Sequence, residues 1–204
     1  MFSSILRFLG FTSKTENQSQ TLTDKQIEDS VKSFLNRPIH KVLTKEIIDK
    51  TNDDELEQTI FDNISIRMAG DQRGEFEIVK SLTNGQQMVY STWAVEGEVN
   101  NGGFNQFYFN SSGQFAEMSV SGFRLIGAYK FADLTNEANI IYEENKARLE
   151  EFDDGTMESF SASYKDNPLN DFDSKFFELY KDENLKELKT KYIRQNYVEF
   201  IQNQ

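Results

Sequence analysis

Apolar residues recur every three or four positions along most of the chain, as expected for amphipathic helices. The clearest stripe is formed by Leu56, Ile60, Ile64 and Met68. Acidic residues at 53–55 suit the positive N-terminal end of such a helix, so a helix is predicted over 53–68. The same periodicity predicts helices near 24–35, 42–49, 86–99, 114–131, 135–150, 156–164 and 171–181, and from Asn184 onward.

Two segments depart from this amphipathic pattern. Residues 75–80 alternate briefly and fit a strand, but no partner strand is evident, so a helix or an extended loop is equally compatible. Residues 114–131 are apolar nearly all round, which predicts one central, buried helix. Together these patterns predict an all-α fold, a single compact domain of about eight or nine helices over residues 23–204 with an N-terminal arm.

Residues 1–22 are predicted to be that arm and its linker. The apolar side chains of Phe2, Ile5, Leu6, Phe8 and Leu9 are interrupted by a basic residue, and the stretch is too short to span a bilayer. An arm that is packed on the domain or frayed is therefore favoured over an interfacial anchor or a partner-docking helix. The sequence predicts a cytoplasmic protein without stable membrane insertion.

The charge of the chain limits the classes of molecule that it is expected to bind. Its 204 residues carry 34 acids and 22 bases, a net charge of −12. This disfavours direct binding to nucleic acid, which requires clustered Lys and Arg, and favours a basic partner. The absence of Cys and the presence of a single His exclude disulfides and disfavour the common metal sites and triads. We therefore expect no cofactor, no metal site, no catalytic residues and no enzymatic activity.

The negative charge is concentrated in one segment. Residues 137–187 hold fifteen acids and six bases, a net charge of −9. Carboxylates on adjacent helical turns lie ~5–6 Å apart, so rows of them resemble the phosphates of DNA; an ordinary solvated acidic face is the alternative. The candidate partner-binding residues are Glu143, Glu144, Glu150, Glu151, Asp153, Asp154, Glu158, Asp171, Asp173 and Glu178.

The most distinctive motif is Glu-Val-Asn-Asn-Gly-Gly-Phe-Asn-Gln-Phe at 98–107, continued by Tyr-Phe-Asn-Ser-Ser-Gly at 108–113. The two glycines are expected to end a helix, and Ser111 with Gln114 fits a capping box for the next one. This interpretation is structural. The alternative is a small-molecule or catalytic pocket in which Glu96 or Glu98 is a base and neighbouring amides orient a ligand. The candidate structural residues are Trp93, Glu98, Asn100, Asn101, Gly102, Gly103, Phe104 and Gln106.

This motif, with Thr92-Trp93 before it and Leu-Ile-Gly-Ala at 125–128 after it, resembles a bacterial domain family that includes a DNA-mimic protein. The family was formerly described as a domain of unknown function. The resemblance covers roughly residues 53–201 and implies an all-helical fold that is often a homodimer. It also implies an acidic surface that occupies the DNA-binding face of a transcriptional repressor. The leading hypothesis is therefore an acidic interaction protein that binds a basic DNA-binding protein and competes with DNA.

Overall fold

The computed structural model describes residues 23–69 and 71–202. Within them the secondary structure consists of ten α-helices and two short 3-10 helices, without a strand, which confirms the all-α prediction. The chain divides into two units, Met1–Ile39 and His40–Gln204. The predicted arm at 1–22 lies outside the described residues, and the assignment of 23–204 to one domain stays a prediction.

In the first unit the described residues form helix α2 (Asp24–Leu35). Its start is fixed locally, because Thr23 Oγ1 accepts from the Gln26 N–H while the Gln26 side chain accepts from the Thr23 N–H. This reciprocal pair is a capping box. It explains why the sequence predicted the start of this helix closely.

The second unit begins with α3 (Lys45–Lys50), α4 (Asp53–Met68) and α5 (Glu75–Lys80). The bounds of α4 are those predicted. Helix α3 begins three residues later than predicted, because Thr44 Oγ1 accepts from the Ile47 N–H and caps it there. Residues 75–80, for which strand, helix and loop were open, are helical.

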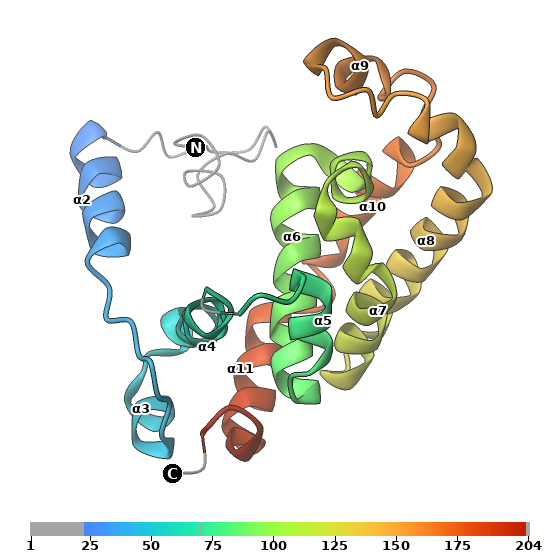
Figure 1. Cartoon of the computed structure of the whole chain (residues 1–204). Helices are drawn as coiled ribbons and strands as arrows, with labels where there is room; N and C mark the ends of the chain where they lie inside the picture. Colours follow the sequence, from blue (N-terminus) through green and yellow to red (C-terminus); the bar gives the residue numbers. More distant parts are fainter. Residues whose placement is uncertain (1–22, 70, 203–204) are drawn as a thin grey trace. The chain divides into compact units, whose positions relative to one another are not determined.

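Helix α6 (Asn84–Phe109) is the centre of the second unit, and fifteen of its residues are buried. It contacts α4, α5, α10 and the 3-10 helix η1 (Ser111–Phe115). Helix α7 (Ala116–Leu125) lies between α6 and α8 (Tyr129–Glu150), as Figure 1 shows. Gly102 and Gly103 have non-helical φ and ψ and interrupt α6, as the sequence predicted, so the first half of α6 ends close to the predicted limit near residue 99. A second helical half follows this kink and ends at Phe109.

The prediction of one helix over 114–131 was wrong. Gly127 has φ +81° and follows the end of α7, with Ala128 N–H donating to Phe123 O (2.9 Å) and Gly127 N–H to Arg124 O (3.1 Å). These two bonds form a Schellman motif, which ends the helix and turns the chain into α8. The predicted Ser111–Gln114 capping box is absent too: η1 has no side-chain cap.

The chain ends with α9 (Met157–Ala162), α10 (Asn170–Leu179), α11 (Leu185–Gln195) and the 3-10 helix η2 (Tyr197–Glu199). Aromatic rings from α6, η1, α7, α8 and α10, and from the residue after η2, fill the core. The fully buried rings are Phe104, Phe107, Phe115, Phe123, Phe131, Phe176 and Phe200. Their burial supplies the main stabilisation that holds these helices together.

Distant carboxylates also accept from backbone N–H groups at the starts of two helices, in α6 in addition to the local capping box of Thr83 with Gln86. Glu199 Oε2 accepts from the Gly85 N–H at the start of α6 (2.6 Å). Glu183 accepts from the N–H groups of Lys130 (3.0 Å) and Phe131 (3.2 Å) at the start of α8. The first N–H groups of a helix have no acceptor within the helix. By accepting from such groups, Glu199 and Glu183 stabilise the fold.

Candidate interaction surface

The kink in α6 lies at the centre of the distinctive motif. Gly102 has φ −149° and ψ 20°, and Gly103 has φ +78° and ψ −179°, a region that only glycine adopts readily. The second half of the helix then starts at Phe104, whose N–H donates to Asp173 Oδ1 on α10 (2.8 Å). A Cβ on Gly103 would overlap the Asp173 carboxylate. Gly103 therefore permits both the turn and the close approach of α10.

Asp173 consequently differs from the other candidate partner-binding acids. Its side chain is half-buried and caps an interior helix start, so the expectation that Asp173 belongs to an exposed acidic surface was wrong. Burial raises the pKa of this carboxyl to about 6, and the hydrogen bond from the Phe104 N–H only partly opposes that shift.

Glu98 ties the two halves of the kinked helix together. Its Oε2 accepts from Gln106 Nε2 (2.5 Å) and Asn110 Nδ2 (2.9 Å), and its Oε1 accepts from Ser112 Oγ (2.9 Å). Gln106 Oε1 in turn accepts from Asn101 Nδ2 (2.9 Å). The polar side chains of the motif thus satisfy one another across the kink.

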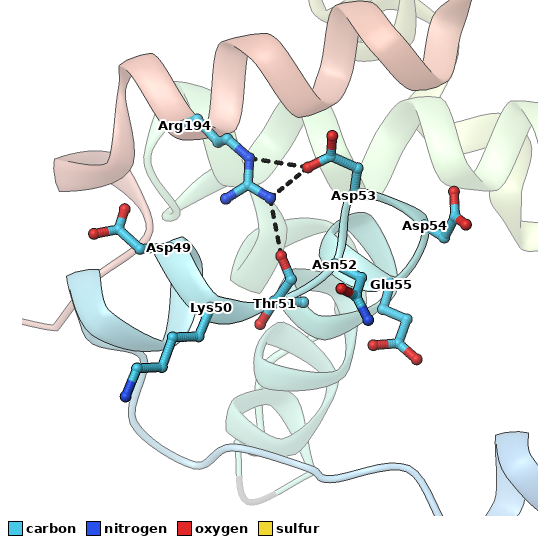
Figure 2. Close-up of a pocket in the computed structure, with 8 residues that line it drawn as sticks. All are labelled: Asp49, Lys50, Thr51, Asn52, Asp53, Asp54, Glu55 and Arg194. Atoms are coloured by element: carbon cyan, nitrogen blue, oxygen red, sulfur yellow. Dashed lines mark hydrogen bonds and ion pairs between the residues drawn. The ribbon is translucent and has the colours of Figure 1, made fainter.

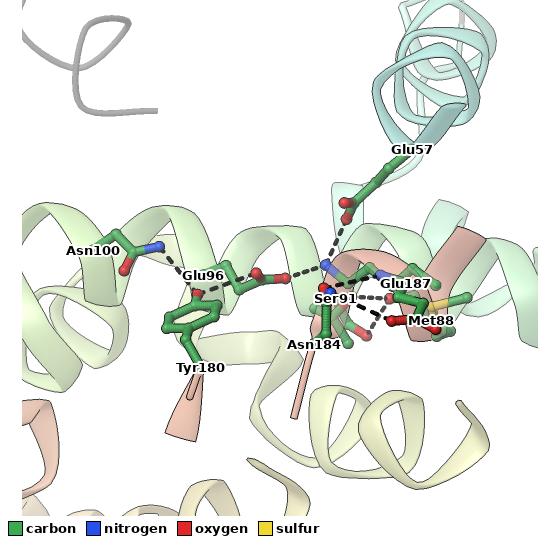
Figure 3. Close-up of polar contacts among 10 residues, drawn as sticks. Glu57, Met88, Ser91, Glu96, Asn100, Tyr180, Asn184 and Glu187 are labelled. Carbon is green, nitrogen blue, oxygen red and sulfur yellow. Dashed lines mark hydrogen bonds and ion pairs between the residues drawn. The ribbon is translucent and has the colours of Figure 1, made fainter. Parts of the chain in front are cut away.

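Glu96 and Asn100 belong to a row of polar contacts that continues into the interior (Figure 3). The Lys189 side chain, 1 % exposed, forms ion pairs with Glu57 (2.6 Å) and with Glu96. Tyr180 OH donates to Glu96 Oε2 (3.1 Å) and accepts from Asn100 Nδ2 (3.3 Å). Because ligand binding requires polar groups that face a cavity, these mutual contacts do not favour the catalytic alternative.

The ionisation of this row follows from its burial and pairing. Burial raises the pKa of Glu96, although the ammonium of Lys189 opposes the rise. Burial alone would lower the pKa of Lys189, but the adjacent carboxylates of Glu57 and Glu96 raise it above its usual value. The Lys189 side chain is therefore charged, and it links α11, on which it lies, to α4 and α6.

The remaining motif residues contact neighbouring elements. Trp93 is half-buried and stacks on Phe61 of α4, with ring centroids 3.9 Å apart. Asn105 Nδ2 donates to Ser163 Oγ just after α9 (2.7 Å), and Tyr164 OH donates to Gly102 O (2.8 Å). These contacts connect α6 to α4 and to the chain that follows α9.

Nine of the ten candidate partner-binding acids are exposed. They lie on the C-terminal part of α8, the connection into α9, α9 itself and α10. Figure 1 shows α8 leading into α9, whereas the end of α10, which carries Glu178, lies beside the start of α8, where Tyr180 contacts Phe131. Some of these acids lie close together around the Tyr142 hydroxyl. Burial raises the pKa of Tyr142, and the negative charges of Glu150, Glu143 and Asp153 raise it further. The structure thus gathers acids from the end of α8 and the following connection.

Three of these nine acids are engaged locally. Lys146 lies 3.6 Å from Glu143, and Lys181 pairs with Glu178. Asp154 accepts from Thr156 Oγ1 and Ser159 Oγ, which lowers the pKa of Asp154. The other six make no side-chain hydrogen bond or ion pair with another described residue: Glu144, Glu150, Glu151, Asp153, Glu158 and Asp171.

Comparison with protein families matches residues 80–196, more than half of the chain, to the family described as DMP19-like protein. The chain belongs to the DMP19-like protein family. The match agrees, at the level of the family, with the resemblance found in the sequence. It covers α6 to α11, including the kink and the acidic segment. Searches of curated proteins and of solved structures gave no match.

Within this DMP19-like segment, sequence reasoning missed part of the acidic surface. Asp133 and Glu137 of α8 are exposed and lie on the same side of the helix as Glu144 and Glu151. The signal was present as a seven-residue repeat, Glu137, Glu144 and Glu151, which returns to nearly the same helix face after two turns. Asp133 is paired with Arg124 at 3.6 Å.

A second acidic group lies mostly outside the family match, at an open hollow beside the α3–α4 turn (Figure 2). Arg194 of α11 occupies it, donating to Ile48 O (2.8 Å) and Thr51 O (2.9 Å) and pairing with Asp53. Lys186 pairs with Asp54. The cations of α11 thus offset the acids here, unlike those at the end of α8.

Among residues 23–69 and 71–202, no three His, Asp or Glu side chains are grouped to hold a metal ion. None of the helices in the same ranges has the length and apolarity needed to cross a bilayer.

Proposed function

We propose that this chain is a DNA mimic that binds a basic DNA-binding protein, such as a transcriptional repressor, and competes with DNA. The observation that carries the proposal is the group of exposed carboxylates without a cation at the end of α8 and beyond, in a member of the DMP19-like protein family. DNA presents about one charge per ~1.7 Å of its axis, so a competitor must present several carboxylates together.

The proposed surface consists of Glu143, Glu144, Glu150, Glu151, Asp153, Asp154, Glu158, Asp171 and Glu178, with Glu137 added and Asp173 removed. A cluster of like charges raises the local concentration of a cationic partner and accelerates association. Binding of this kind weakens as salt increases, because exposed charges are screened beyond about 8–10 Å. The proposal also includes a homodimer and a bacterial setting, which the sequence resemblance implies, and the cytoplasmic location predicted from the sequence.

The distinctive motif has a structural part in this proposal. Contacts of Glu98, Asn101 and Gln106 hold the kink, and the cap on Phe104 places α10 against α6. Helix α10 carries Asp171 and Glu178. The motif would therefore position part of the acidic surface without touching the partner.

The test is competition with DNA. Host proteins that bind double-stranded DNA are passed over the immobilised chain at low and high salt, and each retained protein is purified and titrated with labelled DNA. We expect the chain to displace DNA from at least one of them, less effectively at high salt. Retention of only neutral or acidic proteins, with no effect of salt, would contradict mimicry.

A matched pair of variants locates the surface. The triple variant Glu144→Gln, Glu150→Gln, Glu151→Gln removes three charges from the proposed surface. The control Glu46→Gln, Asp49→Asn, Asp54→Asn removes three from α3 and α4, where each acid is exposed and paired with a lysine. We expect only the first to lose competition, by about tenfold or more, since each ~1.4 kcal/mol is a factor of ten. Equal losses would mean that net charge alone matters.

A further inference from the structure

The outward face of α8 contains apolar side chains among its acids. At 3.6 residues per turn, positions 129, 133, 137, 140, 144, 147 and 151 lie within about 40° of one line along the helix. All seven are exposed, and in order they read Tyr, Asp, Glu, Ile, Glu, Ala, Glu. The opposite face is buried through Phe131, Ala138 and Leu149. Tyr129 lies at the start of this line and Ala147 has a small side chain, so Ile140 is the large apolar residue in the middle of the line, between Glu137 and Glu144.

Ile140 is 51 % exposed. A single exposed isoleucine is ordinary on a protein surface, so its exposure alone has no meaning. Its position is informative because Glu137 and Glu144 flank it on the same line, and neither makes an ion pair with another described residue. Both glutamate side chains are longer than that of isoleucine. The carboxylates can therefore extend past the apolar group and leave it between them.

The spacing of these groups is comparable to that of a DNA groove. Glu137 and Glu144 are seven residues apart, which is ~10.5 Å along a helix, and Glu144 and Glu151 repeat that spacing. The major groove of B-DNA is ~12 Å wide between its phosphate backbones, and the thymine methyl groups lie between those backbones. Proteins read that methyl group with apolar side chains.

We propose that the Glu137–Ile140–Glu144 face of α8 imitates the thymine methyl group of a major groove as well as the phosphates beside it. The proposal rests on the proposed function and specifies the chemistry of the partner's binding surface. That partner is a basic DNA-reading element with an apolar side chain between its cationic side chains. Charge complementarity brings the two surfaces together, and the apolar contact on Ile140 selects among basic partners.

The probes for the test are two synthetic helical peptides of equal charge. Both carry arginines on one face, and at the centre of that face one has Leu and the other Ser. Each peptide is titrated into the full chain at ~50 and ~200 mM salt, and binding is followed by fluorescence anisotropy. The wild-type chain should bind both in a salt-dependent way and prefer the Leu peptide by about tenfold, which corresponds to ~1.4 kcal/mol.

Matched variants assign the preference to one residue. Ile140→Ser should reduce the preference to less than about twofold while leaving the Ser peptide's affinity unchanged. Serine and isoleucine have similar helix propensities, so α8 should persist, as circular dichroism will show. The control Val198→Ser changes another exposed apolar residue, 63 % exposed and outside α8, and should keep the full preference.

The outcomes separate this inference from mimicry itself. Equal binding of both peptides, or a preference that survives Ile140→Ser, overturns the apolar contact but leaves mimicry intact. Failure of both peptides to bind also overturns the inference, and the DNA-competition assay then decides on mimicry independently. Loss of the preference in Ile140→Ser but not in Val198→Ser supports the inference.

Discussion

The carboxylate of Asp173 accepts a hydrogen bond from the backbone N–H of Phe104 across 2.8 Å, and this bond joins α10 to the second half of α6. Two features make this bond sensitive to substitution and to pH. Gly103 leaves room for the carboxylate, and burial raises the pKa of the carboxyl to about 6. Each feature gives a measurable consequence.

The first prediction concerns pH. A carboxyl whose pKa is raised from 3.8 to about 6 on folding binds more protons in the folded state, so its contribution to stability falls as pH rises through that window. We expect Asp173→Asn to stabilise the protein by about 1–2 kcal/mol at pH 7.5, after allowance for solvent screening, and by little at pH 4. Urea unfolding of both proteins between pH 4 and 8 measures this.

The control for this pH dependence is Asp171→Asn, an exposed acid on the same helix. Its effect on the free energy of unfolding should be within about 0.5 kcal/mol at pH 7.5. If Asp173→Asn were strongly destabilising at pH 7.5, the ionised cap would outweigh the cost of burial and the sign given above would be wrong.

The second prediction concerns the kink. Gly103→Ala forces a side chain into a backbone region that only glycine adopts readily and into the Asp173 carboxylate, so it should destabilise the protein by about 3 kcal/mol or more. Gly155→Ala is the matched control: Gly155 has φ +79°, yet nothing lies within 4 Å of an added Cβ. It should cost only the backbone strain, about 1 kcal/mol. Thermal and urea unfolding of both variants give the difference.

The third prediction concerns the buried lysine. Lys189→Met leaves Glu96 and Glu57 without their cation and should cost about 3–5 kcal/mol at pH 7.5. Adding Glu96→Gln should recover part of that loss, because it removes one of the two uncompensated carboxylates. A double-mutant cycle in urea measures the coupling, and simple additivity of the two substitutions would refute the ion pair seen here.

The fourth prediction concerns the cost of the acidic surface itself. Carboxylates crowded on one surface repel one another, so the triple variant Glu144→Gln, Glu150→Gln, Glu151→Gln should be more stable than wild type by about 0.5–1 kcal/mol at low salt. The difference should shrink in ~1 M salt, where the screening length is ~3 Å. Thermal unfolding at several salt concentrations tests this without any partner.

The triple variant of Glu46, Asp49 and Asp54 is again the comparison. It breaks three surface ion pairs, so it should be neutral or slightly destabilising, with little gain at low salt. Stabilisation by the same amount in both variants would indicate a general effect of net charge instead of local crowding.

The sequence predicted those elements whose limits are set by nearby residues. Thr23 with Gln26 and the acids at 53–55 lie within a turn of the helices they start, so α2 and α4 were predicted closely. The turn at Gly127 was missed, because the apolar residues on both sides of it belong to one core and made the whole stretch resemble a single helix.

In the candidate site, too, features set by nearby residues were predictable and those set by distant residues were not. The exposure of the acids at the end of α8 agrees with what their composition implied, although their role stays a prediction. The burial of Asp173 was not predictable, since its partner, Phe104, is 69 residues away in sequence. The pairing of Lys189 with Glu57 and Glu96 likewise spans separate helices. Contacts of this kind depend on the packing of the whole unit.

The distant caps bear on how members of this family diverge. Glu183 and Glu199 each accept from backbone N–H at one fixed helix start, so neither can move to a neighbouring position without loss of its bond. An exposed carboxylate that attracts a partner by its charge alone can be replaced, in a relative, by an acid one helical turn away. We therefore expect the invariant acids among relatives to be those that hold the fold, while those that attract a partner drift. A search for function among the invariant acids would select the wrong ones.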